Sequence, residues 1–387
     1  MTLQNFDQIT IEGYRRIAKL ELPLKSLNVI IGANGSGKTS LLEAMSLLSA
    51  SASGKMADSF ADLGGFNAVR TNLTEWESQA IQFSLRQTTT AAMPLEYEIY
   101  IQPKGVDYSI GEECLFQDRG QTNPFIHFKA SRGNIQYFDS LQEKKLVRPT
   151  WEINPAESAL SQVPRMFSEP EAFRKALASS THYHVLDVSQ KAPIRLPQSM
   201  RTATLPGKNG EDLISCLYMI RETDSDHFDL IQDTLRCGFP SFDRLNFPPV
   251  AAGTLAMTWK DETSSQPFYM HQLSEGTLRF LWLVTLLYSP GLTAVTMIDE
   301  PEVSLHPELL SILADVFRIA SERTQLIIAT HSDRLVRFLT PKEIISTKIE
   351  DDGSTNFTWG TEFDLEGWLK DYTLDQLWQM GRLGGRS

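Results

Sequence analysis

Alternating apolar and polar residues mark the first third of the chain and predict strands with one buried face. The alternation runs through 9–11 and 20–22, on either side of a Gly-Tyr-Arg-Arg turn at 13–16. It returns over 81–85 and 95–101, where every second residue is apolar. Because a period of two is typical of half-buried antiparallel strands, we expect an antiparallel sheet in the N-terminal region.

A second pattern consists of short, unbroken apolar runs, which predict strands buried on both faces of a parallel sheet. Segments with apolar residues three and four positions apart flank these runs and predict helices. The predicted strands are 27–31, 294–298 and 325–329, and the predicted helices are 39–50, 275–289 and 308–321. The fold class is therefore α/β. In an open parallel sheet, ligands bind at the carboxyl ends of the strands, so the polar residues after these runs are candidates for one site.

The segment from about 131 to 250 is richer in proline and polar residues than the rest. Its shorter amphipathic stretches predict a helix that begins near Ser168 and further helices over 213–220 and 228–235. No heptad pattern persists over several turns, so we expect no long coiled coil. These changes divide the chain into three predicted blocks, 1–130, 131–250 and 251–387.

Composition places the chain among soluble globular proteins, with 387 residues, of which 41% are hydrophobic and 22% charged. The longest apolar run, 278–288, contains Arg279 and is too short to span a bilayer, so we expect no membrane partner. Three cysteines without close pairing and an N-terminus without a secretion signal predict a cytoplasmic protein. The net charge of −12 argues against a protein that coats nucleic acid non-specifically.

The segment after the first unbroken apolar run reads G-A-N-G-S-G-K-T, which is the pattern of a phosphate-binding P-loop. Its glycines let successive backbone N–H groups face the phosphates of a nucleotide, and the following helix adds the partial positive charge of its N-terminus. Lys38 supplies a positive charge for the outer phosphates, and the Thr39 hydroxyl is a ligand for Mg²⁺. The predicted phosphate-binding residues are Gly32, Ala33, Asn34, Gly35, Ser36, Gly37, Lys38, Thr39 and Ser40.

Carboxylates follow the second apolar run, and a histidine follows the third. Asp299 and Glu300 follow the predicted strand 294–298 in the arrangement called Walker B. In that arrangement Asp299 holds Mg²⁺, and Glu300 polarises the attacking water as a general base. His331 follows the predicted strand 325–329, where it is placed to sense the γ-phosphate and help to orient the water. The three side chains predict a site for nucleotide hydrolysis.

The helix predicted at 275–289 opens with L-S-E-G-T-L-R, which has two readings. Ser274 is a suitable N-cap, so the segment can serve simply to start the helix. The alternative is a signature motif, in which Ser274, Glu275 and Gly276 contact the γ-phosphate of a nucleotide bound to a second subunit.

The ordered set of motifs resembles the ABC-type ATPase heads of the RecF, SMC and OLD-like group. It consists of G-A-N-G-S-G-K-T, L-S-E-G-T-L-R, M-I-D-E-P-E with L-H-P after it, and A-T-H-S. I-E-G-Y-R-R-I near the start and D-Q-L-W-Q-M-G-R-L-G-G-R at the end are similar to the compact bacterial "predicted ATPase" branch of the RecF-like AAA proteins. The resemblance covers both ends of the chain and the middle block only loosely.

This resemblance implies an ABC-type head, with a mixed sheet and an antiparallel β-subdomain, that is split by an inserted and partly helical lid at 131–250. It also implies a homodimer of heads that sandwiches two ATP molecules. Arg15 would approach the nucleotide, as a basic residue does in related heads, or would lie in a solvated hairpin turn. The glutamine of the Q-loop cannot be assigned, because Gln79 and Gln82 both fit.

Two other functions fit the spacing of the motifs along the chain less well. In the nucleotide-binding subunit of a transporter, the P-loop and the signature lie much closer than Thr39 and Ser274, which are about 235 residues apart. A nuclease domain of the OLD type would need a longer tail than the 56 residues after His331. We therefore expect a Mg²⁺- and ATP-dependent ATPase that acts on DNA or on a separate nuclease or toxin effector, in DNA repair or anti-phage defence. The alternative is a nucleotide-gated scaffold or regulator with little hydrolysis.

Overall fold

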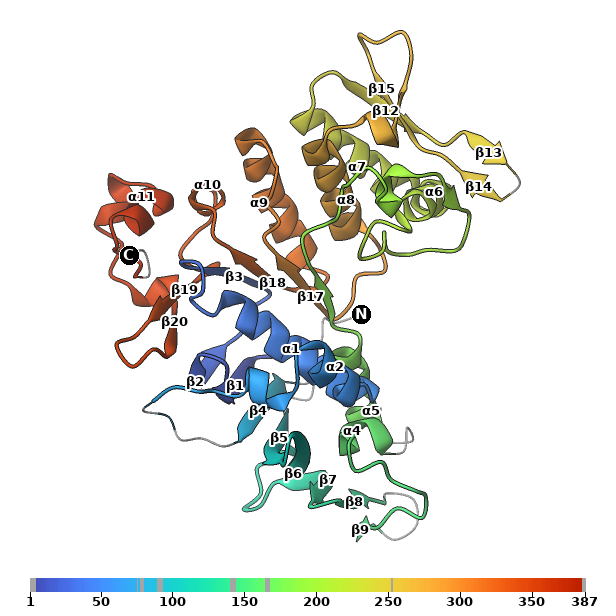
Figure 1. The fold of residues 1–387 in the computed structure, drawn as a ribbon. Helices are drawn as coiled ribbons and strands as arrows, with labels where there is room; N and C mark the ends of the chain where they lie inside the picture. Colours follow the sequence, from blue (N-terminus) through green and yellow to red (C-terminus); the bar gives the residue numbers. More distant parts are fainter. Residues whose placement is uncertain are drawn as a thin grey trace.

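Two sheets form the framework of the computed structural model, which describes residues 5–74, 76, 80–88, 93–139, 144–163, 168–251 and 253–384. The central sheet has six strands and the antiparallel sheet has eight. In Figure 1, helix α1 (Lys38–Ser53) lies between the two sheets, and α8 (Glu275–Tyr288) and α9 (Pro307–Ser321) lie beyond the central sheet. This is the mixed sheet with an antiparallel β-subdomain that the sequence predicts for an ABC-type head.

The central sheet has the strand order β10-β17-β18-β3-β19-β20. All neighbours are parallel except the last pair. The strands are β10 (Thr181–Tyr183), β17 (Val295–Asp299), β18 (Gln325–Thr330), β3 (Leu27–Ile31), β19 (Ile344–Ile349) and β20 (Thr355–Trp359). The three strands predicted from unbroken apolar runs are therefore confirmed as β3, β17 and β18.

Successive residues of these strands are divided between two hydrophobic cores. Val29 and Ile31 of β3 belong to the core that contains α8 and α9, whereas Ile30 belongs to the core around α1. The same alternation continues in β18, where Ile328 and Ile327 face opposite cores. Because side chains alternate across a strand, only a strand that is apolar at every position can bury both faces.

The antiparallel sheet has the order β2-β1-β4-β5-β6-β7-β8-β9 and covers the other side of α1. Ile9 and Ile11 point into this core from one strand, and Leu20 and Leu22 do so from the next. The strands are β1 (Gln8–Tyr14), β2 (Ile17–Pro23), β4 (Ile81–Thr88), β5 (Pro94–Lys104), β6 (Asp107–Gln117), β7 (Phe125–Ser131), β8 (Asn134–Phe138) and β9 (Leu146–Val147). The predicted alternating strands are confirmed as β1, β2, β4 and β5.

The block expected as a lid, 131–250, contributes to several parts of the molecule. Strands β8 and β9 continue the antiparallel sheet, and β10 joins the edge of the central sheet beside β17. Helix α5 (Ser168–Ala178) packs on α1, and α6 (Leu213–Thr223) and α7 (Ser225–Gly238) pack on α8. The division at residues 130 and 250 stays a prediction, and strands β7 and β13 (Pro249–Ala251) run across these two positions.

Short elements complete the fold. The helices are α2 (Met56–Asp62), α3 (Phe66–Val69), α4 (Ala159–Gln162), α10 (Asp333–Val336) and α11 (Leu374–Gln379). Two three-stranded sheets lie near α6 to α8 and contain β11 (Gln198–Ser199), β12 (Phe242–Asn246), β13, β14 (Thr254–Leu255), β15 (Thr258–Asp261) and β16 (Phe268–Tyr269). Among the described segments, no helix has the length and apolar character needed to cross a bilayer.

Candidate active site at the carboxyl ends of the central strands

The three polar segments predicted to meet do so, because β17, β18 and β3 are parallel neighbours. Asp299 at the end of β17 pairs with Ala329 of β18, and Thr330 of β18 pairs with Ile31 of β3. The P-loop, the Walker B carboxylates and His331 therefore leave the same edge of the sheet. Parallel pairing alone accounts for this meeting of residues that lie about 300 positions apart in the chain.

The start of the P-loop packs tightly against β19. A Cβ atom on Gly32 would lie 2.0 Å from Thr347 Oγ1, so only glycine fits there. Ser36 Oγ lies 2.6 Å from the same Thr347 Oγ1, which donates in turn to the Ile31 carbonyl at 3.0 Å. Gly37 has a φ of 90° as it enters α1, which is a left-handed conformation that glycine adopts without strain. Strand β19, which the sequence analysis did not find, therefore holds the loop in shape.

Lys38 is buried at the start of α1, with its ammonium group inside the loop. Its Nζ donates to the carbonyls of Gly32 at 2.9 Å and Ala33 at 2.8 Å. Burial lowers the pKa of Lys38, and the carboxylates of Asp299 and Glu300 oppose this shift. The side chain thus places a positive charge at the centre of the loop, where phosphate oxygens would accept its hydrogen bonds.

Thr39 and Asp299 bring two oxygen ligands together across α1 and β17. Thr39 Oγ1 donates to Asp299 Oδ2 at 3.2 Å. Burial is the largest effect on Asp299 and raises its pKa, while the Thr39 hydrogen bond lowers it. A hydroxyl beside a carboxylate, next to a phosphate-binding loop, is the donor set that Mg²⁺ prefers. The two residues fit the predicted metal site.

Glu300 adopts an uncommon backbone conformation, with a φ of 49°. Its backbone N–H donates to the Ala329 carbonyl at 2.8 Å, which fixes the turn after β17. The carboxylate then lies 3.1 Å from Nδ1 of His331. A left-handed glutamate costs on the order of 1 kcal/mol or more, and such strain concentrates at functional sites.

Glu302 is a further residue of this site that sequence reasoning missed. Its side chain is 8% exposed, and its Oε1 accepts from Thr330 Oγ1 at 2.6 Å and from the His331 backbone N–H at 3.3 Å. Burial raises the pKa of Glu302. This carboxylate ties the end of β18 to the Walker B turn, and so it fixes the backbone that carries His331. Its position two residues after Glu300 was the only available signal.

A cavity of about 620 Å³ opens beside the P-loop. Arginines from two other segments face it: Arg15 and Arg16 from the β1–β2 turn, and Arg70 after α3. Nε of Arg15 is 2.5 Å from Oε2 of Glu43 on α1. The lining is Arg15, Arg16, Asn34, Gly35, Gly37, Lys38, Thr39, Ser40, Ala68, Arg70, Asn72, Leu73 and Glu300. The predicted contact of Arg15 with a nucleotide stays a prediction, while Arg70 is a cationic neighbour that the sequence analysis did not name.

The segment Ser274 to Gly276 is not part of this cavity. Ser274 is the N-cap of α8, since its Oγ accepts from the Thr277 backbone N–H at 3.1 Å. A Cβ on Gly276 would lie 2.5 Å from the Ser304 carbonyl, so glycine allows α8 to approach the loop after β17. Ser274 lines a separate cavity of about 210 Å³ with residues of β15 and β16. Within one chain, therefore, the signature segment does not contact the P-loop cavity.

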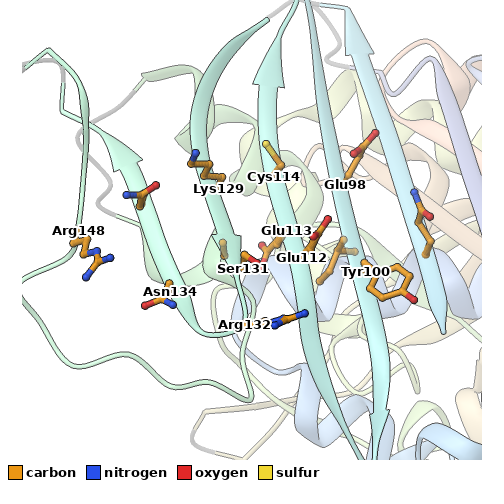
Figure 2. Close-up of a pocket in the computed structure, with 14 residues that line it drawn as sticks. Glu98, Tyr100, Glu112, Glu113, Cys114, Lys129, Ser131, Arg132, Asn134 and Arg148 are labelled. Carbon is orange, nitrogen blue, oxygen red and sulfur yellow. The ribbon is translucent and has the colours of Figure 1, made fainter. Parts of the chain in front are cut away.

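The Q-loop residue remains unassigned. Gln79 lies outside the described residues, and Gln82 on β4 lines a second cavity, of about 590 Å³, on the antiparallel sheet. Figure 2 shows this second cavity, where Glu98, Glu112 and Lys129 project from neighbouring strands and Arg132 from the turn after β7. It shares no lining residue with the P-loop cavity.

A family model described as "AAA domain, putative AbiEii toxin, Type IV TA system" matches residues 27–337, which include every motif of the site. The chain belongs to this AAA family. No curated protein matches the sequence. The match places the chain among the nucleotide-binding P-loop proteins of the AAA family, the class of protein to which the resemblance pointed.

Solved structures similar to this AAA protein are SMC head domains. An SMC head bound to the C-terminal winged-helix domain of ScpA has a TM-score of 0.58 and 12% identity, and the match covers 94% of this chain and 99% of that one. An SMC head with an extended coiled coil, bound to the C-terminal domain of ScpA derived from Pyrococcus furiosus, has a TM-score of 0.54 and 10% identity, with 94% and 98% covered. At this identity the similarity shows the ABC-type head fold.

Proposed function

We propose that this AAA protein binds ATP and Mg²⁺ at the P-loop cavity, hydrolyses the ATP, and closes head to head with a second copy when ATP is bound. The observation that carries the proposal is the contact chain at the sheet edge: Thr39 to Asp299, and Glu300 to His331, beside the buried Lys38. These groups supply a phosphate cradle, a metal site and a general base in one place.

The chemistry of the site follows from the positions of the side chains. Lys38 and the backbone N–H groups of the loop are placed to compensate phosphate charge. Thr39 and Asp299 would hold the metal ion, which would supply positive charge against the charge that develops during transfer. Glu300 accepts the proton of the attacking water. His331, 3.1 Å from Glu300, holds the carboxylate in place, and Glu302 fixes the backbone of His331.

Dimer closure is proposed because one chain does not complete the site. Ser274, Glu275 and Gly276 start α8 away from the P-loop cavity of their own chain. The N-terminus of α8 adds a partial positive charge and an exposed Ser274 hydroxyl, which suit a phosphate presented by another molecule. Hydrolysis would then depend on closure, and loss of the γ-phosphate would release the dimer.

Mixed dimers test this arrangement. Glu300→Gln lacks the base but keeps Ser274, whereas Ser274→Arg keeps the base but blocks the signature. Each variant alone should hydrolyse ATP slowly. In an equimolar mixture, heterodimers contain one complete site, so turnover should rise well above the average of the two variants. Absence of recovery, with both variants folded and binding ATP, would refute catalysis across the dimer.

The biological setting, either DNA or a separate nuclease or toxin effector in repair or anti-phage defence, stays a prediction. The family description names a putative toxin of a type IV toxin–antitoxin system, which supports a protein partner. ATP-dependent DNA binding that weakens with salt would instead support DNA. If the wild-type chain dimerises with ATP but turns over none, with or without DNA, the alternative of a nucleotide-gated regulator holds.

A further inference from the structure

Strand β10 brings two histidines to the Walker B aspartate. His182 pairs with Met297 and Tyr183 with Ile298 in the parallel ladder between β10 and β17, so His184 follows at the level of Asp299. Ligand atoms of His182, His184 and Asp299 lie within 4.8 Å of one another. The two imidazole rings are 4.1 Å apart between centroids. Neither the P-loop reading nor the proposed hydrolysis uses these histidines.

The hydrogen bonds of His182 leave one ring nitrogen available. Ser46 Oγ donates its proton to the Leu42 carbonyl at 2.8 Å, so its oxygen can only accept from His182 Nδ1 at 3.2 Å. The ring proton is therefore on Nδ1, and Nε2 carries a lone pair. His182 is 7% exposed, and Nε2 is buried without a hydrogen-bond partner in the part of the chain that the structure describes.

A buried acceptor without a donor is costly, and such a group calls for an explanation. A histidine whose Nδ1–H is fixed by a neighbour and whose Nε2 is bare has the arrangement of a metal ligand oriented by its surroundings. His184 is exposed, which leaves a path for an ion from solvent. Asp299 has two carboxylate oxygens, of which Oδ2 accepts from Thr39.

The donor set indicates the class of ion. Imidazole nitrogens suit zinc and neighbouring transition metals, whereas Mg²⁺ prefers oxygen ligands. Two histidines and one carboxylate are also a typical ligand set for zinc with an open fourth position. We propose that His182, His184 and Asp299 form a site for a transition-metal ion of the zinc class, beside the Thr39–Asp299 magnesium site.

The consequence of this site rests on the proposed function. Because Asp299 belongs to both ligand sets, a zinc-class ion on the histidines competes for the carboxylate that serves the nucleotide's Mg²⁺. Occupancy of the histidine site then inhibits ATP turnover without blocking the P-loop itself. The second site is an inhibitory input on the ATPase.

Zn²⁺ titration of the nucleotide-free chain of 387 residues by calorimetry tests the binding. The wild type should bind one ion per chain. His184→Ala, which removes the exposed histidine of the site, should bind Zn²⁺ at least tenfold more weakly. His306→Ala is the matched control, because this exposed histidine lies at the start of α9 and outside the cluster. Equal affinity in the wild type and His184→Ala would overturn the site. Co²⁺ absorption gives a second readout, since a tetrahedral spectrum should be lost in His184→Ala.

Two further measurements separate this proposal from the proposed function. Lys38→Ala removes the phosphate-binding lysine and should leave Zn²⁺ binding unchanged, whereas Asp299→Asn should weaken it. Zn²⁺ should inhibit wild-type turnover in excess Mg²⁺, and His184→Ala should resist this inhibition by at least tenfold in Zn²⁺ concentration. Zn²⁺ binding without any turnover would refute only the ATPase. Turnover with equal Zn²⁺ sensitivity in the wild type and His184→Ala would refute only the inhibitory input.

Discussion

Two cavities of nearly equal volume, about 620 Å³ at the P-loop and about 590 Å³ on the antiparallel sheet, differ in how their walls are built. The P-loop cavity takes its lining from a loop, a helix start and turns that lie far apart in the sequence. The sheet cavity is lined mainly by side chains of adjacent strands β5 to β7, seen in Figure 2. Size therefore does not distinguish the two.

Topology explains the difference. Parallel strands all end at one edge, so polar groups that follow β3, β17 and β18 converge there with the P-loop. On an antiparallel sheet, side chains are spread along a face, and the ladder already uses the backbone groups. Glu98 and Glu112 there stand among Lys129 and Arg132, so no single charge dominates. We infer that the P-loop cavity, and not the sheet cavity, is the catalytic site.

The largest expected effect is on turnover in Glu300→Gln. Loss of a general base costs roughly 10²- to 10⁴-fold in rate. ATP binding should persist, because Lys38 and Thr39 remain, and ATP-bound dimers should accumulate. Phosphate release and light scattering with ATP measure both properties. Wild-type turnover in this variant would contradict the role of Glu300.

Lys38→Ala should weaken ATP binding by roughly tenfold to a hundredfold, because charge-assisted hydrogen bonds contribute on the order of 1.5–3 kcal/mol. Equilibrium binding of a fluorescent ATP analogue measures the loss. The matched control is Lys129→Ala, which removes a lysine from the sheet cavity. If both variants lose affinity equally, the comparison between the two cavities fails.

His127 on β7 should make the antiparallel region sensitive to acid. Burial lowers its pKa from 6.5 to about 4, with a smaller contribution from Arg119. Below pH 6.5 the unfolded chain binds a proton that the folded chain does not, so stability should fall as the pH drops towards 4. The loss reaches on the order of 3 kcal/mol. Denaturant unfolding at pH 7 and pH 4.5 should show a smaller loss in His127→Gln than in the wild type; an equal loss would exclude His127 as its source.

The smallest effect is expected in the sheet cavity itself. Tyr100→Ser and Glu112→Gln change exposed or half-buried groups that contact no P-loop residue in the described structure. ATP affinity and turnover should stay within about twofold of the wild type, since surface substitutions usually change little. A larger change in turnover would show that the two cavities are coupled.

Local patterns predicted most of the framework. The unbroken run at 27–31 became β3, and the alternating runs became β1, β2, β4 and β5. The cap at Ser274 was also correct. These features depend on residues within a few positions of one another, so periodicity and capping chemistry suffice to find them.

Long-range neighbours were not predictable in this way. Thr347, which packs against Gly32, lies on a strand that the sequence analysis missed, and Arg70 reaches the P-loop cavity from the end of the short helix α3. No sequence pattern assigned a role to Glu302, whose carboxylate accepts hydrogen bonds from Thr330 and His331 in the structure. Each role depends on a contact between segments that no local pattern connects.

The sequence by itself determined that a strand, a glycine-rich loop and a helix follow one another, and that carboxylates and a histidine end two other buried strands. Those features depend only on the order of residues along the chain. Only the tertiary structure decided that β10 lies beside β17, so that His182 and His184 approach Asp299. The physical reason is that strand order in a sheet is set by packing on both faces, and many orders satisfy the same apolar runs.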